Sequence, residues 1–152
     1  MISRKLKGAL RLSNSSRRAA AMPPIKEWKM IGLLLDLNNN KTKVIEASSL
    51  QDYYDLIGCN LIEIVSRKIG RKRFDIVCDE EGTFVAEPKI SAIDNLGTPM
   101  FVGNLIICGS ANEEGELTDL STRDIDYIKK RIVKMCTHRH PEGYLMLTQC
   151  EY

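Results

Sequence analysis

Residues 60–82 read NLIEIVSRKIGRKRFDIVCDEEG and contain two apolar runs separated by a basic segment. Successive side chains of a β-strand point to opposite faces, so the first run places Glu63 and Val65 on one face and Ile62 and Ile64 on the other. The segment KIGRK is typical of a turn. The stretch therefore predicts two antiparallel strands, NLIEIVSR and RFDIVCD, joined by a short hairpin.

The segment before this hairpin predicts a further strand pair and a short helix. Residues 30–37, MIGLLLDL, and residues 41–47, KTKVIEA, are separated by asparagines. Asparagine tolerates the left-handed conformation that tight hairpins require, so these residues predict a first hairpin. Ser48 or Ser49 can cap a helix through LQDYYDLIG, and Gly58 is suited to ending it.

The segment after the acidic residues continues the alternation of strands and turns. TFVAE, residues 83–87, predicts a fifth strand, and PKISAIDNLGTP, residues 88–99, predicts a loop with one helical turn. VGNLIICG, residues 102–109, is short and apolar throughout. This composition predicts a sixth strand that is buried on both faces or central in the sheet.

The last predicted element is a long helix over about residues 122–137. Ser121 and Asp124 have the spacing of a helix-capping pair. Apolar residues then recur at spacings of three and four, as on one face of a helix: Ile125, Ile128, Ile132 and Met135.

Together these elements predict an α+β fold, with a small, mostly antiparallel sheet of about five to six strands packed by one short and one long helix. A chain of 152 residues is suited to one domain with its own core. We expect residues 29–138 to form that domain. Residues 1–28 then form a basic, flexible N-terminal extension, and residues 139–152 form a C-terminal tail or an edge strand.

Positive charge is concentrated at the start of the chain. Residues 1–22 contain no acidic residue and six basic ones: Arg4, Lys5, Lys7, Arg11, Arg17 and Arg18. The remainder of the chain is therefore mildly acidic. This tail could be an organelle-targeting segment, a nucleic-acid-binding arm or a disordered segment. Its composition favours disorder until it is bound.

The distribution of apolar residues and cysteines indicates a cytoplasmic protein. The apolar run from Met30 to Leu35 stops at Asp36, well short of the roughly 20 residues that span a bilayer. The five cysteines are odd in number and form no CxxC pair: Cys59, Cys78, Cys108, Cys136 and Cys150. This pattern fits reduced thiols in the cytosol, and we expect no membrane association.

Three consecutive acids, Asp79, Glu80 and Glu81, precede Gly82. They could be a metal site, a catalytic carboxylate pair or a turn. Alternate side chains of a strand diverge, so adjacent acids converge poorly on one cation, which needs six or more oxygen ligands. A solvated hairpin turn with Gly82 at a positive φ is therefore the favoured interpretation.

The segment CTHRH contains three residue types that bind zinc: Cys136, His138 and His140. Their spacing is not a usual zinc pattern, and a fourth ligand would have to come from Cys150 or elsewhere. We therefore expect no metal and no cofactor. A cysteine–histidine nucleophile would also need an orienting third group and an oxyanion site, which the sequence does not indicate.

A basic cluster lies on the predicted turn between the third and fourth strands: Arg67, Lys68, Arg71, Lys72 and Arg73. With the basic residues of the long helix it could form a phosphate-binding surface. A solvated hairpin loop balanced by nearby acids is the favoured alternative. The glycine-containing segment GSANEEG is acidic, so it is not expected to hold phosphate.

The order of several motifs resembles that of a known family. LIGCNLIEIV, DEEG, ISAIDN, VGNLIICG and LTDLSTRDIDYI follow one another between about Met30 and Arg131. In this order they resemble a bacterial and phage family known only as a domain of unknown function, found in phages, prophages and conjugative elements. The resemblance implies a phage or mobile-element accessory protein and no particular chemistry.

Three functions of different classes follow. The first, which the resemblance favours, is a non-enzymatic protein that binds a host protein, such as a defence or restriction component, in the host cytoplasm. The second is nucleic-acid binding through the basic tail and the Arg67 to Arg73 turn. The third is a small enzyme or a small-nucleotide binder with a pocket between the sheet and its helices.

Overall fold

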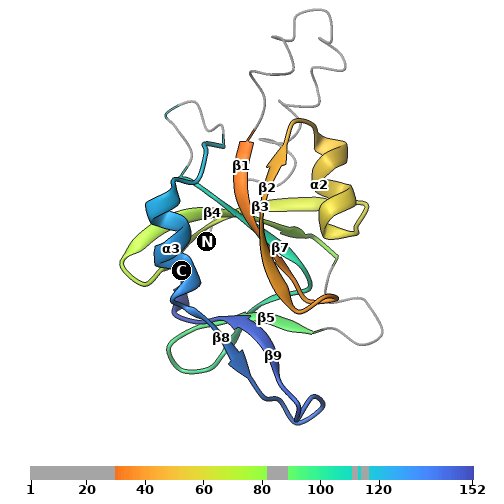
Figure 1. Ribbon diagram of the computed structural model, residues 1–152, viewed down its shortest axis with the longest axis vertical. Coiled ribbons are helices and arrows are strands. Elements are labelled where there is room, and N and C mark those ends of the chain that lie inside the picture. Colours follow the sequence, from red (N-terminus) through yellow and green to blue (C-terminus); the bar gives the residue numbers. More distant parts are fainter. Residues whose placement is uncertain (1–29, 82–88, 111–112, 114–116) are drawn as a thin grey trace, which may run out of the picture.

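The structure is a computed structural model that describes residues 30–81, 89–110, 113 and 117–152 (Figure 1). A six-stranded sheet consists of β1 (Met30–Asp36), β2 (Lys41–Ala47), β3 (Ile62–Ile69), β4 (Lys72–Asp79), β7 (Leu105–Cys108) and β10 (Cys150–Glu151), in the order β10-β3-β4-β7-β1-β2. A four-stranded sheet consists of β5 (Ile90–Ile93), β6 (Pro99–Val102), β8 (Ile132–Met135) and β9 (Tyr144–Leu147), in the order β6-β5-β9-β8.

Two eight-residue helices, α2 (Leu50–Ile57) and α3 (Thr122–Lys129), complete the described part of the chain. They lie on opposite sides of the molecule, and β5, β8 and β9 lie together at its lower end in Figure 1. The strand pairs are antiparallel except for β5 with β9. The predicted α+β class with a mostly antiparallel sheet is therefore confirmed.

The hairpin of β3 and β4 has the register that the alternating sequence predicts. Glu63 pairs with Cys78, Val65 with Ile76, and so on along the full length of both strands. Gly70, in the turn between them, has a φ of 65°. That left-handed conformation is one that glycine adopts without steric cost.

One face of the six-stranded sheet packs against α2. Ile64 of β3 and Ile106 of β7 share a buried cluster with Tyr53 and Ile57 of the helix. The helix begins after Ser49, whose side chain accepts a hydrogen bond from a main-chain N–H of the first turn, as predicted.

The opposite face packs against α3 and the four-stranded sheet. Val65 of β3 and Ile107 of β7 share a second buried cluster with Ile128 of α3 and Leu147 of β9. Leu105–Cys108 is buried throughout and lies between β4 and β1. The predicted central position of this strand is confirmed, because a strand covered on both faces carries apolar side chains on both.

The predicted long helix is wrong in length. The main-chain N–H of Arg131 donates to the carbonyl of Ile128 (2.8 Å), a tight turn that ends α3. Ile132 then begins β8, which pairs with Leu147 of β9, and Met135 pairs with Tyr144. The apolar residues whose spacing suggested another helical turn instead belong to a strand, because they pack beside their cross-strand partners.

The predicted loop over residues 88–99 is also wrong, because it contains β5 and the first residue of β6. Asp94 Oδ1 accepts hydrogen bonds from the main-chain N–H groups of Leu96 and Thr98 (2.8 Å each), which closes a turn between the two strands. Residues 102–109 are likewise divided, since Gly103 has a φ of 84° and separates β6 from β7.

The C-terminal residues form two strands of different kinds. β10 lies at an edge of the six-stranded sheet, whereas β9 lies inside the four-stranded sheet between β5 and β8. Tyr144, Met146 and Leu147 of β9 are buried. Residues 139–152, predicted as a tail or edge strand, therefore contribute to the core as well as to an edge.

The predicted fifth strand, residues 83–87, and the basic tail lie outside the described residues. Neither α2 nor α3, the helices of the described ranges, is long and apolar enough to cross a membrane.

Candidate functional site

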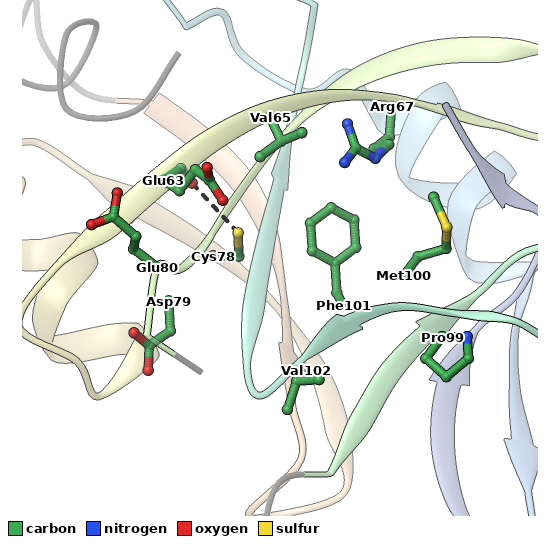
Figure 2. Close-up of a pocket in the computed structure, with 10 residues that line it drawn as sticks. All are labelled: Glu63, Val65, Arg67, Cys78, Asp79, Glu80, Pro99, Met100, Phe101 and Val102. Carbon is green, nitrogen blue, oxygen red and sulfur yellow. Dashed lines mark hydrogen bonds between the residues drawn. The ribbon is translucent and has the colours of Figure 1, made fainter. Parts of the chain in front are cut away.

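A pocket of about 300 Å³ lies between the β3–β4 hairpin and β6 (Figure 2). We call it the inter-sheet pocket, because β3 and β4 belong to one sheet and β6 to the other. Its lining consists of Glu63, Val65, Arg67, Cys78, Asp79, Glu80, Pro99, Met100, Phe101 and Val102.

The wall that β6 contributes is apolar. It consists of four consecutive residues, Pro99 to Val102, and Figure 2 shows the ring of Phe101 in the middle of the pocket. Phe101 is buried, whereas Pro99 is exposed at the rim. β6 is an edge strand of the four-stranded sheet, so this wall is the edge of that sheet.

Three carboxylates gather on one side of the pocket. Glu63 occupies a position of β3 that faces the pocket, and Asp79 and Glu80 follow at the end of β4 (Figure 2). The turn is fixed by two hydrogen bonds: Glu80 N–H donates to the carbonyl of Leu61 (3.0 Å), and Glu81 N–H donates to Asp79 Oδ1 (2.8 Å). All three lining carboxylates belong to half-buried residues.

Arg67 lies on the opposite side of the pocket and is only 5% exposed. Its guanidinium carbon lies 5.4 Å from the ring centroid of Phe101 and 4.7 Å from that of Tyr152. Its Nη1 donates to the carbonyl of Ser66 (2.9 Å). Burial lowers the pKa of this guanidinium. The usual pKa of arginine is so high that the side chain still carries its charge at neutral pH.

Cys78 lines the pocket as a thiol. Its Sγ donates a hydrogen bond to the main-chain carbonyl of Glu63 (3.6 Å), its cross-strand partner. Burial strongly raises the pKa of Cys78, so at neutral pH the side chain is protonated. A protonated, buried thiol is a weak hydrogen-bond donor and a poor nucleophile.

Three acidic side chains and one basic side chain give the lining a net negative charge. The carboxylates are separated from Arg67 by Val65 and Phe101, so they form an acidic end next to an apolar wall (Figure 2). Such an arrangement suits a cationic group carried on an apolar stem, because the carboxylates attract the charge and the wall packs against the stem.

The residues of the predicted basic cluster divide between the core and the surface. Arg67 is buried beside the pocket, whereas Lys68, Arg71, Lys72 and Arg73 are exposed. Lys72 Nζ forms an ion pair with Asp124 of α3 (2.9 Å). Arg73 donates to Ser66 Oγ (3.1 Å) and to the main-chain oxygen of Tyr152 (2.8 Å).

The turn that carries this cluster contacts the end of α3. The main-chain N–H of Arg71 donates to the hydroxyl of Tyr127 (2.6 Å). Lys72 Nζ and the guanidinium carbon of Arg131 lie 4.9 and 3.8 Å from the ring centroid of Tyr127. The basic residues of the turn and of the helix end therefore adjoin one another, an arrangement that the sequence left open.

The candidate metal ligands of the sequence do not converge. Among the described residues, no three side chains of histidine, cysteine, aspartate or glutamate are placed to share a metal ion. Cys136 is exposed. His140 Nδ1 instead lies 3.4 Å from a carboxylate oxygen of Glu142.

Residues 30–133 match the model of a family described as Domain of unknown function (DUF3846). The chain belongs to this family. No curated protein and no solved structure matches the chain. Every residue that lines the inter-sheet pocket falls within the DUF3846 domain, whereas Cys136, His138 and His140 follow its last matched residue.

Sequence reasoning missed Glu63 and Phe101 as site residues within the DUF3846 domain. Glu63 and Arg67 are four residues apart on β3 and share the face that carries Val65. Charged residues at inward-facing positions of an apolar strand are a signal for a polar site. Phe101 carried no such signal, because β6 begins in a segment predicted as a loop.

Proposed function

We propose that the protein is a non-enzymatic accessory protein of a phage or mobile element that acts by binding a host protein in the cytoplasm, with a defence or restriction component as the target. The family resemblance supports the genomic setting. The inter-sheet pocket supports the mode of action, because it is a concave site with an acidic end and an apolar wall.

The partner contributes a lysine or arginine side chain to this pocket. Its aliphatic stem lies against Phe101, and its charge lies beside Glu63 and Glu80. A volume of about 300 Å³ accommodates one long side chain. Protein interfaces commonly depend on a few anchor residues in such pockets, and arginine is among the most frequent.

Site-specific photo-crosslinking in host cells tests this proposal. A benzophenone side chain at Pro99 lies on the pocket rim, and the same probe at Lys43 of β2 is an exposed control. We expect a defined crosslinked product from position 99 and none from position 43. The absence of a product at position 99 in every host tested, or identical products from both positions, would overturn the proposal.

A charge-neutral variant identifies the recognition chemistry. Glu63→Gln combined with Glu80→Gln removes two charges from the acidic end, and Asp55→Asn removes an exposed carboxylate from α2 as the matched control. We expect the first variant to weaken binding of the crosslinked partner by at least about tenfold and the control to leave it unchanged. Equal affinities for both would exclude the pocket.

A second candidate function is nucleic-acid binding, which the contact between the Arg71 turn and the end of α3 favours. The Tyr127 side chain joins Arg131 to the Arg71 turn there, the exposed Lys129 and Lys130 precede Arg131 in the sequence, and the basic tail adds further positive charge in the sequence. Such a surface suits the phosphate backbone rather than particular bases.

A salt titration of duplex binding by fluorescence anisotropy tests this second candidate. We expect log K to fall linearly with log salt, and Arg71→Gln with Lys130→Gln to reduce the slope by about 0.9 for each phosphate that the variant no longer neutralises. Lys43→Gln is the exposed control. Undetectable binding at low ionic strength removes the candidate, and a loss confined to deletion of residues 1–22 assigns binding to the tail.

A further inference from the structure

A second pocket, of about 470 Å³, lies where the segment after β8 passes the four-stranded sheet. We call it the loop pocket. One wall consists of Ile90 of β5, Val102 of β6 and Tyr144 of β9, and the other consists of the consecutive residues Thr137, His138, Arg139 and His140. Val102 also lines the inter-sheet pocket, so the two sites are neighbours.

The loop wall is held in shape by its own hydrogen bonds. Thr137 and His140 exchange main-chain hydrogen bonds in both directions (3.1 Å each), and the His140 N–H also donates to Thr137 Oγ1 (3.0 Å). Gly143 N–H donates to the carbonyl of His140 (2.9 Å). These hydrogen bonds within the loop fix its backbone, so the wall is formed before a ligand binds.

The sheet wall is equally fixed. The hydroxyl of Tyr144 donates to the carbonyl of Ile90 (2.8 Å). The His140 ring meets the Tyr144 ring edge-on, with the centroids 5.5 Å apart and an angle of 87°. Ile90, Val102 and Tyr144 therefore form an apolar surface against which a flat group can pack.

The charge of the loop pocket is opposite to that of the inter-sheet pocket. Arg139 is an exposed cation of the lining, and no acidic side chain lines the pocket in the described ranges. Lys89 adds a second cation nearby, since its Nζ lies 5.3 Å from the ring centroid of Tyr144. The nearby acid Glu142 points its carboxylate to His140 Nδ1 (3.4 Å).

We propose that the loop pocket binds a small organic anion, with a phosphate or carboxylate group attached to a flat, apolar body. The anionic group lies at the Arg139 and His138 end, and the body packs on Ile90, Val102 and Tyr144. This proposal does not rest on the proposed function, so either can be overturned without the other. It gives the CTHRH segment a role as an anion-binding wall rather than as a metal site.

Titration calorimetry of the full chain with four probes tests the proposal. Adenosine 5′-monophosphate and 1-naphthoate each combine an anion with a flat body and distinguish phosphate from carboxylate. Adenosine supplies a body alone, and inorganic phosphate supplies an anion alone. We expect saturable binding of at least one combined probe, at least about tenfold tighter than binding of either partial probe, because both walls are then used.

Variants locate the binding. Arg139→Gln should weaken the combined probe by about tenfold or more, the factor of one charge-assisted hydrogen bond. Arg123→Gln, an exposed arginine on α3, is the matched control and should have no effect. Both side chains are exposed, so we expect both variants to fold.

Three results would overturn the proposal. The first is that neither combined probe binds. The second is that a partial probe binds as tightly as the combined one, which would show that one wall suffices. The third is that binding survives Arg139→Gln combined with His138→Gln, which would place the ligand elsewhere on the chain.

Discussion

The guanidinium carbon of Arg67 lies 5.4 Å from the centroid of the Phe101 ring. Arg67 belongs to β3 of the six-stranded sheet and Phe101 to β6 of the four-stranded sheet. The pair therefore joins the two sheets at the inter-sheet pocket, where a buried charge meets the face of an aromatic ring. The same guanidinium contacts the ring of Tyr152, which is 68% exposed.

Removal of the Phe101 ring should destabilise the protein strongly. Phe101 is 8% exposed, so Phe101→Ala leaves a cavity and should lower the free energy of unfolding by about 3–4 kcal/mol. Tyr152→Ala should cost about 1 kcal/mol or less, because most of that ring is in solvent. Urea denaturation measures both. Equal costs would contradict the central position of Phe101.

A double-mutant cycle separates the arginine–ring contact from burial. Arg67→Met and Phe101→Leu, made singly and together, should show a coupling of about 0.5–2 kcal/mol in the free energy of unfolding. A coupling within error of zero would mean that the two side chains are neighbours without an energetic contact.

The six-stranded sheet could largely be predicted from sequence, because the residues that define its strands and turns are close together in the chain. Alternation in NLIEIV sets the two faces of β3, and NNN and KIGRK mark turns within a few residues of the strands they join. The end of α3 could not be predicted in this way. Ile132 has the same spacing for a helix face as for a buried strand, and its partner Leu147 is distant in sequence.

The candidate site was less predictable because it depends on tertiary contacts. The acids at the end of β4 were visible as a turn, and that interpretation offered no reason to place Asp79 and Glu80 beside Phe101. Arg67 belonged to a basic cluster in sequence, yet the alternation of β3 turns it inward while Lys68 stays exposed. Only the position of β6 shows which charged residues share a pocket.

The two left-handed glycines Gly70 and Gly58 should respond differently to alanine. Both have a positive φ, 65° and 80°, so both substitutions carry a similar backbone penalty of about 1 kcal/mol. A Cβ at Gly58 meets open space, whereas one at Gly70 collides with Tyr127 Oη and Arg131 Nε.

We therefore expect Gly70→Ala to lower the free energy of unfolding more than Gly58→Ala, because the Tyr127 and Arg131 side chains must shift to admit the methyl group. Thermal or urea unfolding measures the difference. Equal stability of the two variants would contradict the close contact between the β3–β4 turn and α3. It would also weaken the argument for nucleic-acid binding, which depends on that contact.

The cysteines should differ in reactivity according to burial. All five are free thiols; Cys136 is exposed, and Cys78, Cys108 and Cys150 are buried. Burial raises the pKa of Cys150 and of Cys108 to about 12, so neither forms the reactive thiolate at pH 8. Alkylation of the native protein followed by peptide mapping should modify Cys136 first. Labelling of Cys150 at the same rate would contradict the fold around β10.

The raised thiol pKa values also predict how stability depends on pH. Burial raises the pKa of Cys150 from 9.0 to about 12, so the folded state keeps a proton that the unfolded chain loses. The stabilisation is complete below pH 9 and is lost as pH rises toward 12. Between those values the free energy of unfolding should fall as pH rises, by on the order of 1 kcal/mol per pH unit for each such thiol.

The variant Cys150→Ala isolates one thiol in this dependence. It lowers stability at pH 8 because the sulfur no longer packs in the core, yet its free energy of unfolding should decline less steeply between pH 9 and 10.5 than that of the unmodified chain. Cys136→Ala, at an exposed thiol, is the matched control for the loss of a cysteine side chain. Parallel pH profiles for Cys150→Ala and the unmodified chain would show that Cys150 titrates alike in both states, and therefore that β10 does not bury it against Arg67 and β3.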